Sequence, residues 1–421
     1  MKLRMKTKNI IIAVAALTVG AAANANEAVV PVSAMAGPIE VRVDPNFELI
    51  AMVCHLAGYE EYALSLYKEQ DRKLIKDRFG SLTNHPAVKA FKNYRKKAGI
   101  SYDAPASLSV HLKPDLSGYL VPLDPWPQRL DTRWKKIDLE EVRRQLVDFR
   151  SASRFDEWYA ARAEANRTIV GEAIKKISDM HLPEWLGRYY GPQKRRMSLR
   201  VVLSLMTSGG NYGCSIDLSD EETLYTPIVG HSEWGIVQVL PHEFSHPFNR
   251  APDRRILREV ERESPQALAG LKKEFEKVKG KMSRQSYGNF HTWWGETFNR
   301  ANELRYFRSY LPEYEDRSTK YVVVKFTDMV MYRLEMFEAK GFALVRPLYN
   351  LLDKYEADRK KYKTLDDFVP VIVDFLVERY SNEGREDSRH HALHQVPQRE
   401  EAVKSAVGFS GCHIDKCGKP P

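Results

Sequence analysis

The residues at 242–246, which read HEFSH, constrain this chain of 421 residues more than any other part of its sequence. Residues i and i+4 share one face of a helix, so His242 and His246 present two imidazoles to one point, a spacing that can bind one zinc ion. Glu243 lies beside the first histidine, where a carboxylate can act as a general base and take a proton from the zinc-bound water. The sequence therefore predicts a helix over 242–249 with His242 and His246 as zinc ligands and Glu243 as the catalytic base.

A third ligand has to come from another segment, because a catalytic zinc usually has three protein ligands and one open position. The segment 291–306 carries two glutamates seven residues apart, which fall on one face of a helix. Glu296, 50 residues after His246, is the favoured ligand, and Glu303 is the alternative. Weaker candidates for the same position are His231, Glu233 and His291.

Pro247 limits the helix that this motif can form. It lacks the N–H that would bond to the carbonyl of Glu243, and it disfavours the helical conformation of the residue before it. We therefore expect a short helix that ends or kinks after one turn, which is enough to align the two histidines.

The alternative without a metal site is a surface helix that carries two histidines by chance. Glu296 then forms only an i,i+4 ion pair with Arg300.

The rest of the chain predicts an α+β fold that is mostly helical, with a small mixed sheet next to the HEFSH helix. The segments 199–206 and 235–240 are rich in β-branched and aliphatic residues and predict two strands, and the run GGNYG between them predicts a turn. Apolar residues at helical spacing predict helices over 47–57, 59–79, 85–98, 138–154, 168–190 and most of 265–380.

The N-terminus has the three parts of a secretory signal peptide. Lysine and arginine are scattered over residues 2–8, an apolar run covers 10–19, and Ala23-Asn24-Ala25 forms a cleavage site with no neighbouring cysteine that could carry a lipid. We therefore expect a periplasmic or secreted protein. No later segment has 18 uninterrupted apolar residues, so we expect no stable membrane insertion after cleavage.

These signals divide the chain into five parts: a signal peptide at 1–25, an extended segment at 26–45, a helical region at 46–195, the core with the metal motif and a helical C-terminal region at 196–380, and a charged tail at 381–421. The tail histidines, His390, His391 and His394, are expected to belong to a solvated segment. Cys54 lies in an apolar helical pattern and is expected to be a buried free thiol, whereas Cys412 and Cys417 are close enough to form a small loop.

The charge pattern argues against a nucleic-acid-binding protein. The formal net charge is +9, but lysine and arginine alternate with aspartate and glutamate along the chain. Such interleaving is typical of a solvated mixed surface and lacks the clustered basic patch that binds phosphates.

The motif HExxH followed by a distant glutamate-bearing helix resembles the gluzincin class of zinc metallopeptidases. The wider chain resembles an exported bacterial family of unknown function with a metallopeptidase-like core, through VDPNFELIAMVCHLAGYEEY, NHPAVKAFKNYRKKAGISYDA, LPHEFSHPFN and GETFNRANELRYF, over about 44–380.

The gluzincin resemblance implies an edge strand over 206–214 that binds the peptide backbone, and a tyrosine or histidine that assists the oxyanion. The candidates for that assisting role are Tyr212, Tyr287 and His291. The common pattern has an aspartate four residues after the glutamate ligand, where it orients a zinc-bound histidine. Arg300 occupies that position here, and Asn299 is the nearest alternative acceptor.

We therefore expect an exported zinc metallopeptidase that hydrolyses peptide bonds in a peptide or protein substrate. The alternative is a catalytically silent metal-binding or substrate- or glycan-binding protein on a peptidase scaffold. A third possibility is a structural exported protein with a fortuitous motif. The carboxylate of Glu243 favours catalysis, because a site that only holds a metal does not need it.

Overall fold

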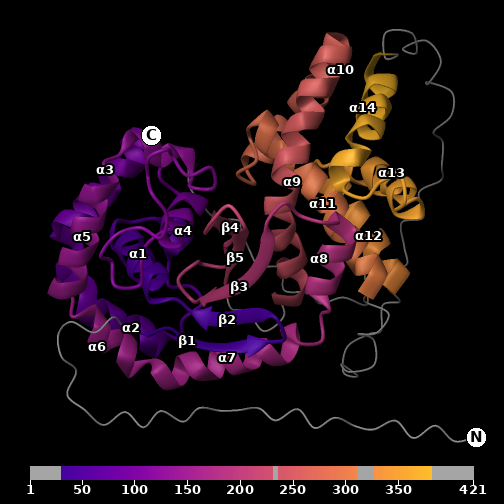
Figure 1. The fold of residues 1–421 in the computed structure, drawn as a ribbon. Helices are drawn as coiled ribbons and strands as arrows, with labels where there is room; N and C mark the ends of the chain where they lie inside the picture. The colour runs from indigo at the N-terminus through magenta and orange to yellow at the C-terminus, as the bar shows by residue number, and fades with distance from the viewer. Residues whose placement is uncertain (1–29, 231–235, 311–325, 382–421) are drawn as a thin grey trace, which may run out of the picture.

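The structure, a computed structural model, describes residues 30–230, 236–310 and 326–381. These residues form an α+β fold in which helices surround a five-stranded mixed sheet (Figure 1). The strands are β1 (Val32–Ala36), β2 (Ile39–Val43), β3 (Arg196–Ser204), β4 (Asn211–Asp217) and β5 (Glu222–Gly230). The helices before β3 are α1 (Pro45–Leu56), α2 (Glu69–Phe79), α3 (Pro86–Ala98), α4 (Asp103–Ser109), α5 (Leu139–Ala152), α6 (Phe155–Ala161), α7 (Ala163–Ile177) and α8 (Leu182–Tyr190). The helices after the sheet are α9 (Ile236–Glu263), α10 (Pro265–Ser283), α11 (Phe290–Tyr310), α12 (Phe326–Lys340), α13 (Val345–Ala357) and α14 (Leu365–Ser381).

The strands follow the order β1-β2-β3-β5-β4. The three central strands are parallel, whereas β1 and β4 at the two edges run antiparallel to their neighbours. The helix α9 packs on β4 and β5, and α7 packs on β1 and β2. One long helix therefore packs on the face of the sheet that β5 and the edge strand β4 form.

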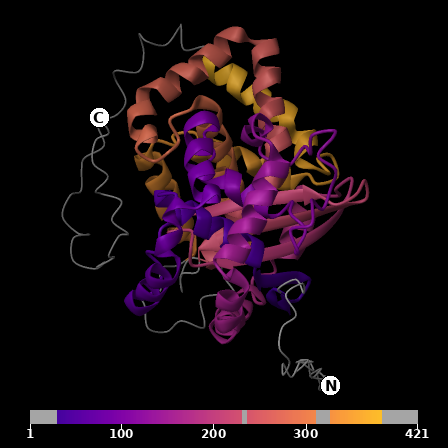
Figure 2. The same ribbon diagram turned by 90° about the vertical axis from the view of Figure 1, so that its left-hand side faces the viewer.

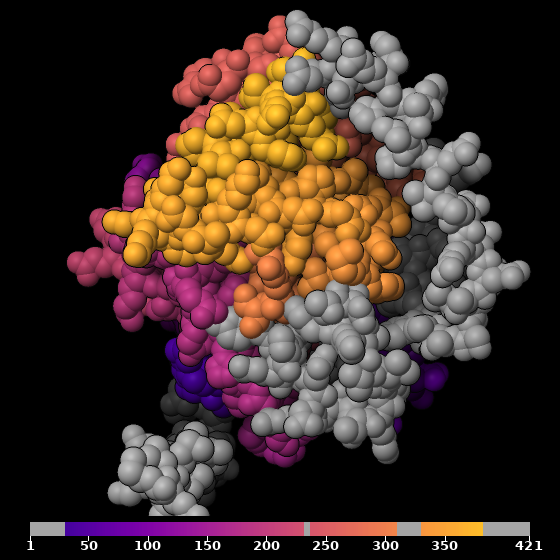
Figure 3. Space-filling view, turned by 90° about the vertical axis from the view of Figure 1, so that its right-hand side faces the viewer, coloured from indigo at the N-terminus to yellow at the C-terminus, as the bar shows by residue number. Residues whose placement is uncertain are grey.

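The two helical regions lie on opposite sides of the sheet (Figure 1). The helices α1 to α6 gather on one side, and α9 to α14 gather on the other. In the second view, α10 and α14 lie together above the sheet (Figure 2). The last three helices, α12 to α14, make up much of the face of the molecule that Figure 3 shows. A continuous core of buried apolar side chains joins the two regions through the sheet.

Several helices begin and end where local signals predict. Asp44 caps α1 by accepting hydrogen bonds from the backbone N–H groups of Asn46 and Phe47, and Asp138 caps α5 in the same way. The helix α3 starts at Pro86 and stops at Gly99, whose φ of 68° is the left-handed conformation that glycine adopts freely. The predicted helices at 47–57, 85–98 and 138–154 are thus confirmed.

The helix with the HEFSH motif is longer than predicted. It runs over 28 residues and continues through Pro241, Pro247 and Pro252, so the expected end after one turn is wrong. A proline in a helix interior costs about 3 kcal/mol. Buried apolar side chains along the helix, including Phe244 and Ile256, offset this cost by packing on the sheet and the neighbouring helices.

The strand predicted at 235–240 is also wrong, because residues 236–240 form the first turn of α9. Ile236 and Leu240 are both buried, and their spacing of four places them on one face of a helix. A short apolar run of this kind is compatible with either a helix or a strand.

Other differences concern breaks between elements. The helix expected over 59–79 is formed only from Glu69 onward, after a short 3₁₀ turn at Glu60–Tyr62. The helix expected over 168–190 is two helices, separated where His181 adopts a left-handed φ of 47°. The strand at 199–206 is confirmed as β3, the segment at 26–45 contains the β1–β2 hairpin, and β5 was not predicted.

Some expectations fall outside the described residues: the signal peptide at 1–25, the candidates His231 and Glu233, and the tail with its histidines, Cys412 and Cys417. Cys54 is buried and free as predicted, and Cys214 on β4 is buried and free as well. Among the helices that the structure describes, none has the length and apolar character to span a membrane.

Candidate metal centre

Two helices bring the predicted ligands together. His242 and His246 lie one turn apart on α9, and their Nε2 atoms are 3.0 Å from each other. Glu296 projects from α11, with Oε2 3.6 Å from Nε2 of His242 and Oε1 3.4 Å from Nε2 of His246. The ligand atoms of these three residues lie within 4.8 Å of one another.

This arrangement fits a tetrahedral zinc ion. Ligand atoms about 2.0–2.1 Å from a tetrahedral zinc lie roughly 3.3–3.4 Å apart, close to the three separations in the structure. Two imidazole nitrogens and one carboxylate are also a donor set that catalytic zinc sites use. The side chains are only partly exposed, at 12% for His242, 26% for His246 and 14% for Glu296, so one side of the centre remains open.

Glu303, the alternative third ligand, lies on the other side of the His242 ring. Its Oε2 accepts a hydrogen bond from Nδ1 of His242, the nitrogen that points away from His246. A proton fixed on Nδ1 leaves the Nε2 lone pair directed at the centre, which is how an outer carboxylate orients a metal-ligating histidine. The geometry thus separates the two glutamates, with Glu296 at the centre and Glu303 behind His242.

Asn299 does not take the acceptor position that Arg300 leaves vacant in the sequence pattern. Its amide nitrogen donates to the backbone carbonyl of His242 at 3.0 Å, and its oxygen accepts from Asn249 at 2.7 Å. Glu303 supplies the acceptor instead, from a position seven residues after Glu296.

Two arginines balance the buried carboxylates. Arg300 donates to Oε2 of Glu296 at 2.9 Å, so the i,i+4 pair exists in addition to the cluster with the histidines. The guanidinium of Arg300 lies against aromatic rings, 4.7 Å from the Phe342 centroid and 5.0 Å from that of Phe337. Arg333 on α12 donates to Oε1 of Glu303 at 3.1 Å.

The charges around the centre set the protonation of its ligands. Burial lowers the pKa of His246 to about 3, so this imidazole is neutral and able to coordinate a metal. Burial also lowers the pKa of His242, but the charge and hydrogen bond of Glu303 outweigh it and raise the pKa above its usual value. Burial raises the pKa of Glu296, yet the charges of Arg300 and the two histidines hold it below its usual value, so the carboxylate is ionised.

Glu243 lies beside these ligands and next to the edge strand. A Cβ added to Gly213 on β4 would be 3.3 Å from Oε2 of Glu243 and 2.7 Å from its carbonyl oxygen. That carbonyl has no N–H partner four residues on, because position 247 is a proline. Glycine at 213 therefore allows β4 to approach α9 closely at the level of the motif.

The carboxylate of Glu243 is buried, with 6% of the residue exposed, and within the described part of the chain no side chain or backbone group hydrogen-bonds to it. Burial raises its pKa to about 7, and the charge of His242 opposes this rise. A carboxylate with a pKa near neutral pH can both take and release a proton.

The three candidates for the oxyanion position fall in different places. Tyr212 is buried and stacks on Tyr62, with the ring centroids 6.0 Å apart. His291 is exposed at the start of α11. Tyr287 lies beside Arg300 and Glu296: its hydroxyl accepts a hydrogen bond from Arg300 at 3.1 Å, and its pKa is raised to about 12, first by the charge of Glu296 and then by burial.

The edge strand expected over 206–214 is shifted along the chain. Residues 206–209 form a turn, and β4 begins at Asn211 and ends at Asp217. β4 is the last strand of the sheet, so among the described residues no strand pairs with its outer edge.

Sequence reasoning missed two groups of this site. Arg333 comes from a helix 30 residues after Glu303, and no local pattern connects it with the motif. The aromatic rings around Arg300 come from α12 and from the turn after it, so only the tertiary fold brings them to the site.

The comparisons with known proteins add a family but no activity. The model of a domain of unknown function, DUF4932, matches residues 39–375, which is most of the chain. No curated protein and no solved structure matches the sequence.

Proposed function

We propose that this chain, which belongs to the DUF4932 family of unknown function, is an exported zinc metallopeptidase of the gluzincin type. The observation that carries the proposal is the convergence of Nε2 of His242, Nε2 of His246 and the carboxylate of Glu296 beside the free carboxylate of Glu243. A zinc ion held there would lower the pKa of a bound water to about 7 and polarise the carbonyl of a substrate.

Glu243 acts as the general base in this proposal. Its carboxylate has no hydrogen-bond partner among the described residues, so both oxygens are available to a water or to a substrate amide. A site that only stores metal has no need of a further carboxylate with a raised pKa beside its ligands. The same carboxylate can pass the proton to the leaving amine.

Tyr287 acts as the donor to the developing oxyanion. Its oxygen accepts a hydrogen bond from Arg300, so its own O–H remains free to donate. Its pKa of about 12 keeps the phenol protonated at neutral pH. A preorganised donor of this kind stabilises charge that develops only in the transition state.

The strand β4 provides a place for the peptide backbone. An extended substrate that pairs with the outer edge of β4 would pass Gly213, which touches the backbone of the motif helix. Backbone pairing is independent of side chains and therefore suits hydrolysis of peptide bonds. Export through the signal peptide at 1–25 completes the proposal.

The test combines metal content with turnover. We expect about one zinc per chain in the purified wild type and in the Glu243→Gln variant, and none in His242→Ala, by elemental mass spectrometry. His55→Ala on α1 is the matched control for loss of a histidine and should retain the metal. The zinc-loaded wild type should cleave members of a broad peptide library, and Glu243→Gln should cleave none.

Each arm has its own negative outcome. Zinc that persists in His242→Ala would overturn the site. Zinc without cleavage of any peptide by the wild type would favour the silent metal-binding alternative. Cleavage that persists in Glu243→Gln would remove the role given to this residue.

A further inference from the structure

A cleft of about 810 Å³ opens beside the metal centre. His246 and Glu296 lie at one end of it, and the lining continues along the second half of α9, the start of α10 and the first turns of α11. Its size is within the range of sites that enclose a ligand or several side chains of a peptide. A substrate bound at the metal centre could therefore extend into this cleft between α9, α10 and α11.

A row of arginines lines the cleft. Arg250, Arg254 and Arg258 follow His246 at steps of four residues, so they form one ridge of α9 that begins at a metal ligand. All three side chains are exposed. Within the ranges that the structure describes, no carboxylate comes within ion-pair distance of any of the three, although most other arginines of the chain have such a partner.

The other charges of the cleft do not cancel this row. Lys272 on α10 adds a fourth cation, and the carboxylates that line the same space are Asp253 and Glu261, apart from the ligand Glu296. Asp253 is tucked against α11, where a Cβ on Gly295 would be 3.2 Å from its Oδ2. Burial raises the pKa of Asp253 to about 7, so part of its negative charge is lost near neutral pH.

The floor of the cleft is apolar. Leu257, Leu268, Phe290 and Trp294 contribute to its lining. An apolar floor with a cationic rim suits a peptide that carries carboxylates together with apolar side chains. A cleft with low-dielectric walls and an excess of positive charge also concentrates anionic ligands.

We propose that this cleft binds an acidic segment of the peptide substrate, so that the enzyme prefers peptides with aspartate or glutamate next to the scissile bond. The inference rests on the proposed function, because it takes the peptide in the cleft to be a substrate. Binding of acidic peptides to the cleft can nevertheless be tested without turnover. The arginine row presents its charges from the metal ligand outward, which places the acidic residues of the ligand on one side of the bond.

The test measures binding with the zinc-loaded full chain carrying Glu243→Gln, so that no probe is consumed. The probes are fluorescein-labelled octapeptides with four glutamates, four glutamines or four lysines in the same frame, and a single-stranded oligonucleotide of the same charge as the acidic peptide. By fluorescence anisotropy, we expect the acidic peptide to bind about tenfold more tightly than the glutamine peptide at low salt, with the difference lost at about 1 M salt.

Charge reversal tests whether the arginines are responsible. Arg254→Glu with Arg258→Glu should bring the affinities for the acidic and glutamine peptides to within about twofold of each other. Lys89→Glu with Lys175→Glu, at exposed positions of α3 and α7, makes the same change in net charge and should leave the preference intact. An intact preference after arginine reversal, or equal binding of all peptides, would overturn the inference.

The remaining outcomes separate this inference from the proposed function. Equal or tighter binding of the oligonucleotide would overturn the assignment to peptides. Cleavage of neutral and acidic peptides at equal rates by the wild type would leave the metallopeptidase in place and remove the specificity. Tight acidic binding that depends on the arginines, without any cleavage, would keep the cleft and remove the peptidase.

Discussion

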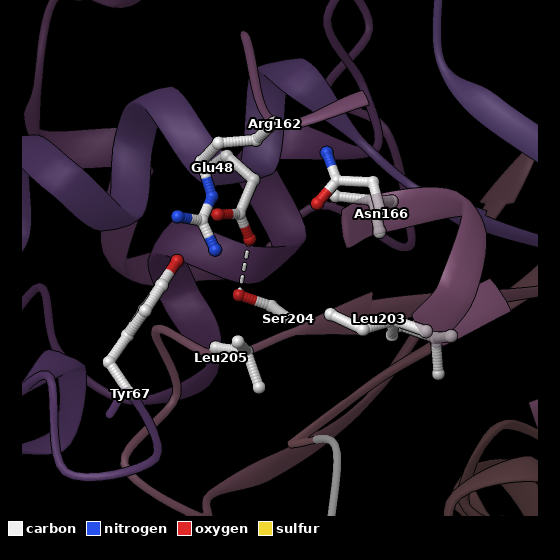
Figure 4. A pocket seen from close by; sticks show the side chains of 9 residues that line it. Glu48, Tyr67, Arg162, Asn166, Leu203, Ser204 and Leu205 are labelled. Atoms are coloured by element: carbon white, nitrogen blue, oxygen red, sulfur yellow. Dashed lines mark hydrogen bonds between the residues drawn. The ribbon is translucent and has the colours of Figure 1, made fainter. Parts of the chain in front are cut away.

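A buried carboxylate away from the metal centre gives a stability prediction with a definite sign. Glu48 on α1 is 4% exposed, and its carboxylate accepts a hydrogen bond from Ser204 at the end of β3 (Figure 4). Figure 4 also shows the guanidinium of Arg162 and the hydroxyl of Tyr67 turned toward it. Burial raises the pKa of Glu48 from 4.5 to about 7, against the opposing hydrogen bond of Ser204 and the charge of Arg162.

The raised pKa makes Glu48 a source of instability at neutral and alkaline pH. The folded state holds its proton more tightly than the unfolded state, so the contribution of the group is intact below pH 4.5 and is lost as the pH rises through about 7. With pKa values of 4.5 unfolded and about 7 folded, the loss between pH 5 and pH 8 is about 2.5 kcal/mol.

The perturbation is Glu48→Gln, which keeps the shape and removes the titration. We expect the free energy of unfolding of the variant, minus that of the wild type, to rise by about 2.5 kcal/mol from pH 5 to pH 8. Urea unfolding at four pH values in that range measures it, with EDTA in every sample so that metal binding adds no pH dependence of its own. Glu335→Gln, at an exposed position of α12, is the control for the change in net charge.

A difference that stays constant across the pH range would refute the reasoning, because it would mean that Glu48 is ionised as readily in the folded chain as in the unfolded one. A difference that falls with pH would reverse the sign and make Arg162 the dominant influence instead of burial.

Three further predictions concern the metal centre. Glu303→Gln should weaken zinc binding by about 10–100-fold, and Glu296→Gln by more, as measured by competition with a chelator; the reverse order would exchange ligand and orienting group. Tyr287→Phe should lower kcat by about 10²–10³-fold with little change in KM or zinc content, and an unchanged kcat would leave the oxyanion without this donor. Gly213→Ala should destabilise the fold by about 1–3 kcal/mol, because its Cβ would be 2.7 Å from the carbonyl oxygen of Glu243. Gly171→Ala, whose Cβ would have no atom within 4 Å, is the control and should not destabilise it. Equal shifts of the melting temperature in the two variants would contradict the close approach at Gly213.

The sequence was sufficient for those parts of the site that depend on helical spacing. The pairing of His242 with His246 and the common face of Glu296 and Glu303 both follow from the period of 3.6 residues, and the structure has both. Local pattern favoured Glu296 over Glu303 as the third ligand, but it could not show which carboxylate faces the two Nε2 atoms. That depends on how the ring of His242 is turned relative to α11, which only the packing of the two helices determines.

The errors in the fold have the same origin. Four of the residues 236–240 are apolar and two are valines, which favours a strand, whereas in the structure they begin α9 with Ile236 and Leu240 buried one turn apart. The strand β5 was not predicted. It is an inner strand, paired with β3 and β4, yet it contains Pro227, a residue that usually argues against an inner strand. Its ladder with β3 passes from Tyr225 to Ile228 with no pairs between, so the sheet tolerates the proline by omitting bonds there.

The order of charges on α11 explains why an arginine stands at position 300, where the usual gluzincin pattern has an aspartate. Glu296, Arg300 and Glu303 stand at i, i+4 and i+7, so one helical face presents carboxylate, guanidinium and carboxylate in succession beneath His242. The negative charges of both glutamates hold the pKa of Arg300 above its usual value, despite burial, which lowers it. An aspartate at 300 would place a third acid between two others in a buried site, whereas the arginine donates to the carboxylate of Glu296, and Glu303 accepts from Nδ1 of His242. With Glu243 also ionised, three carboxylates would face two arginines, and a divalent cation is the group that would reverse that residual negative charge.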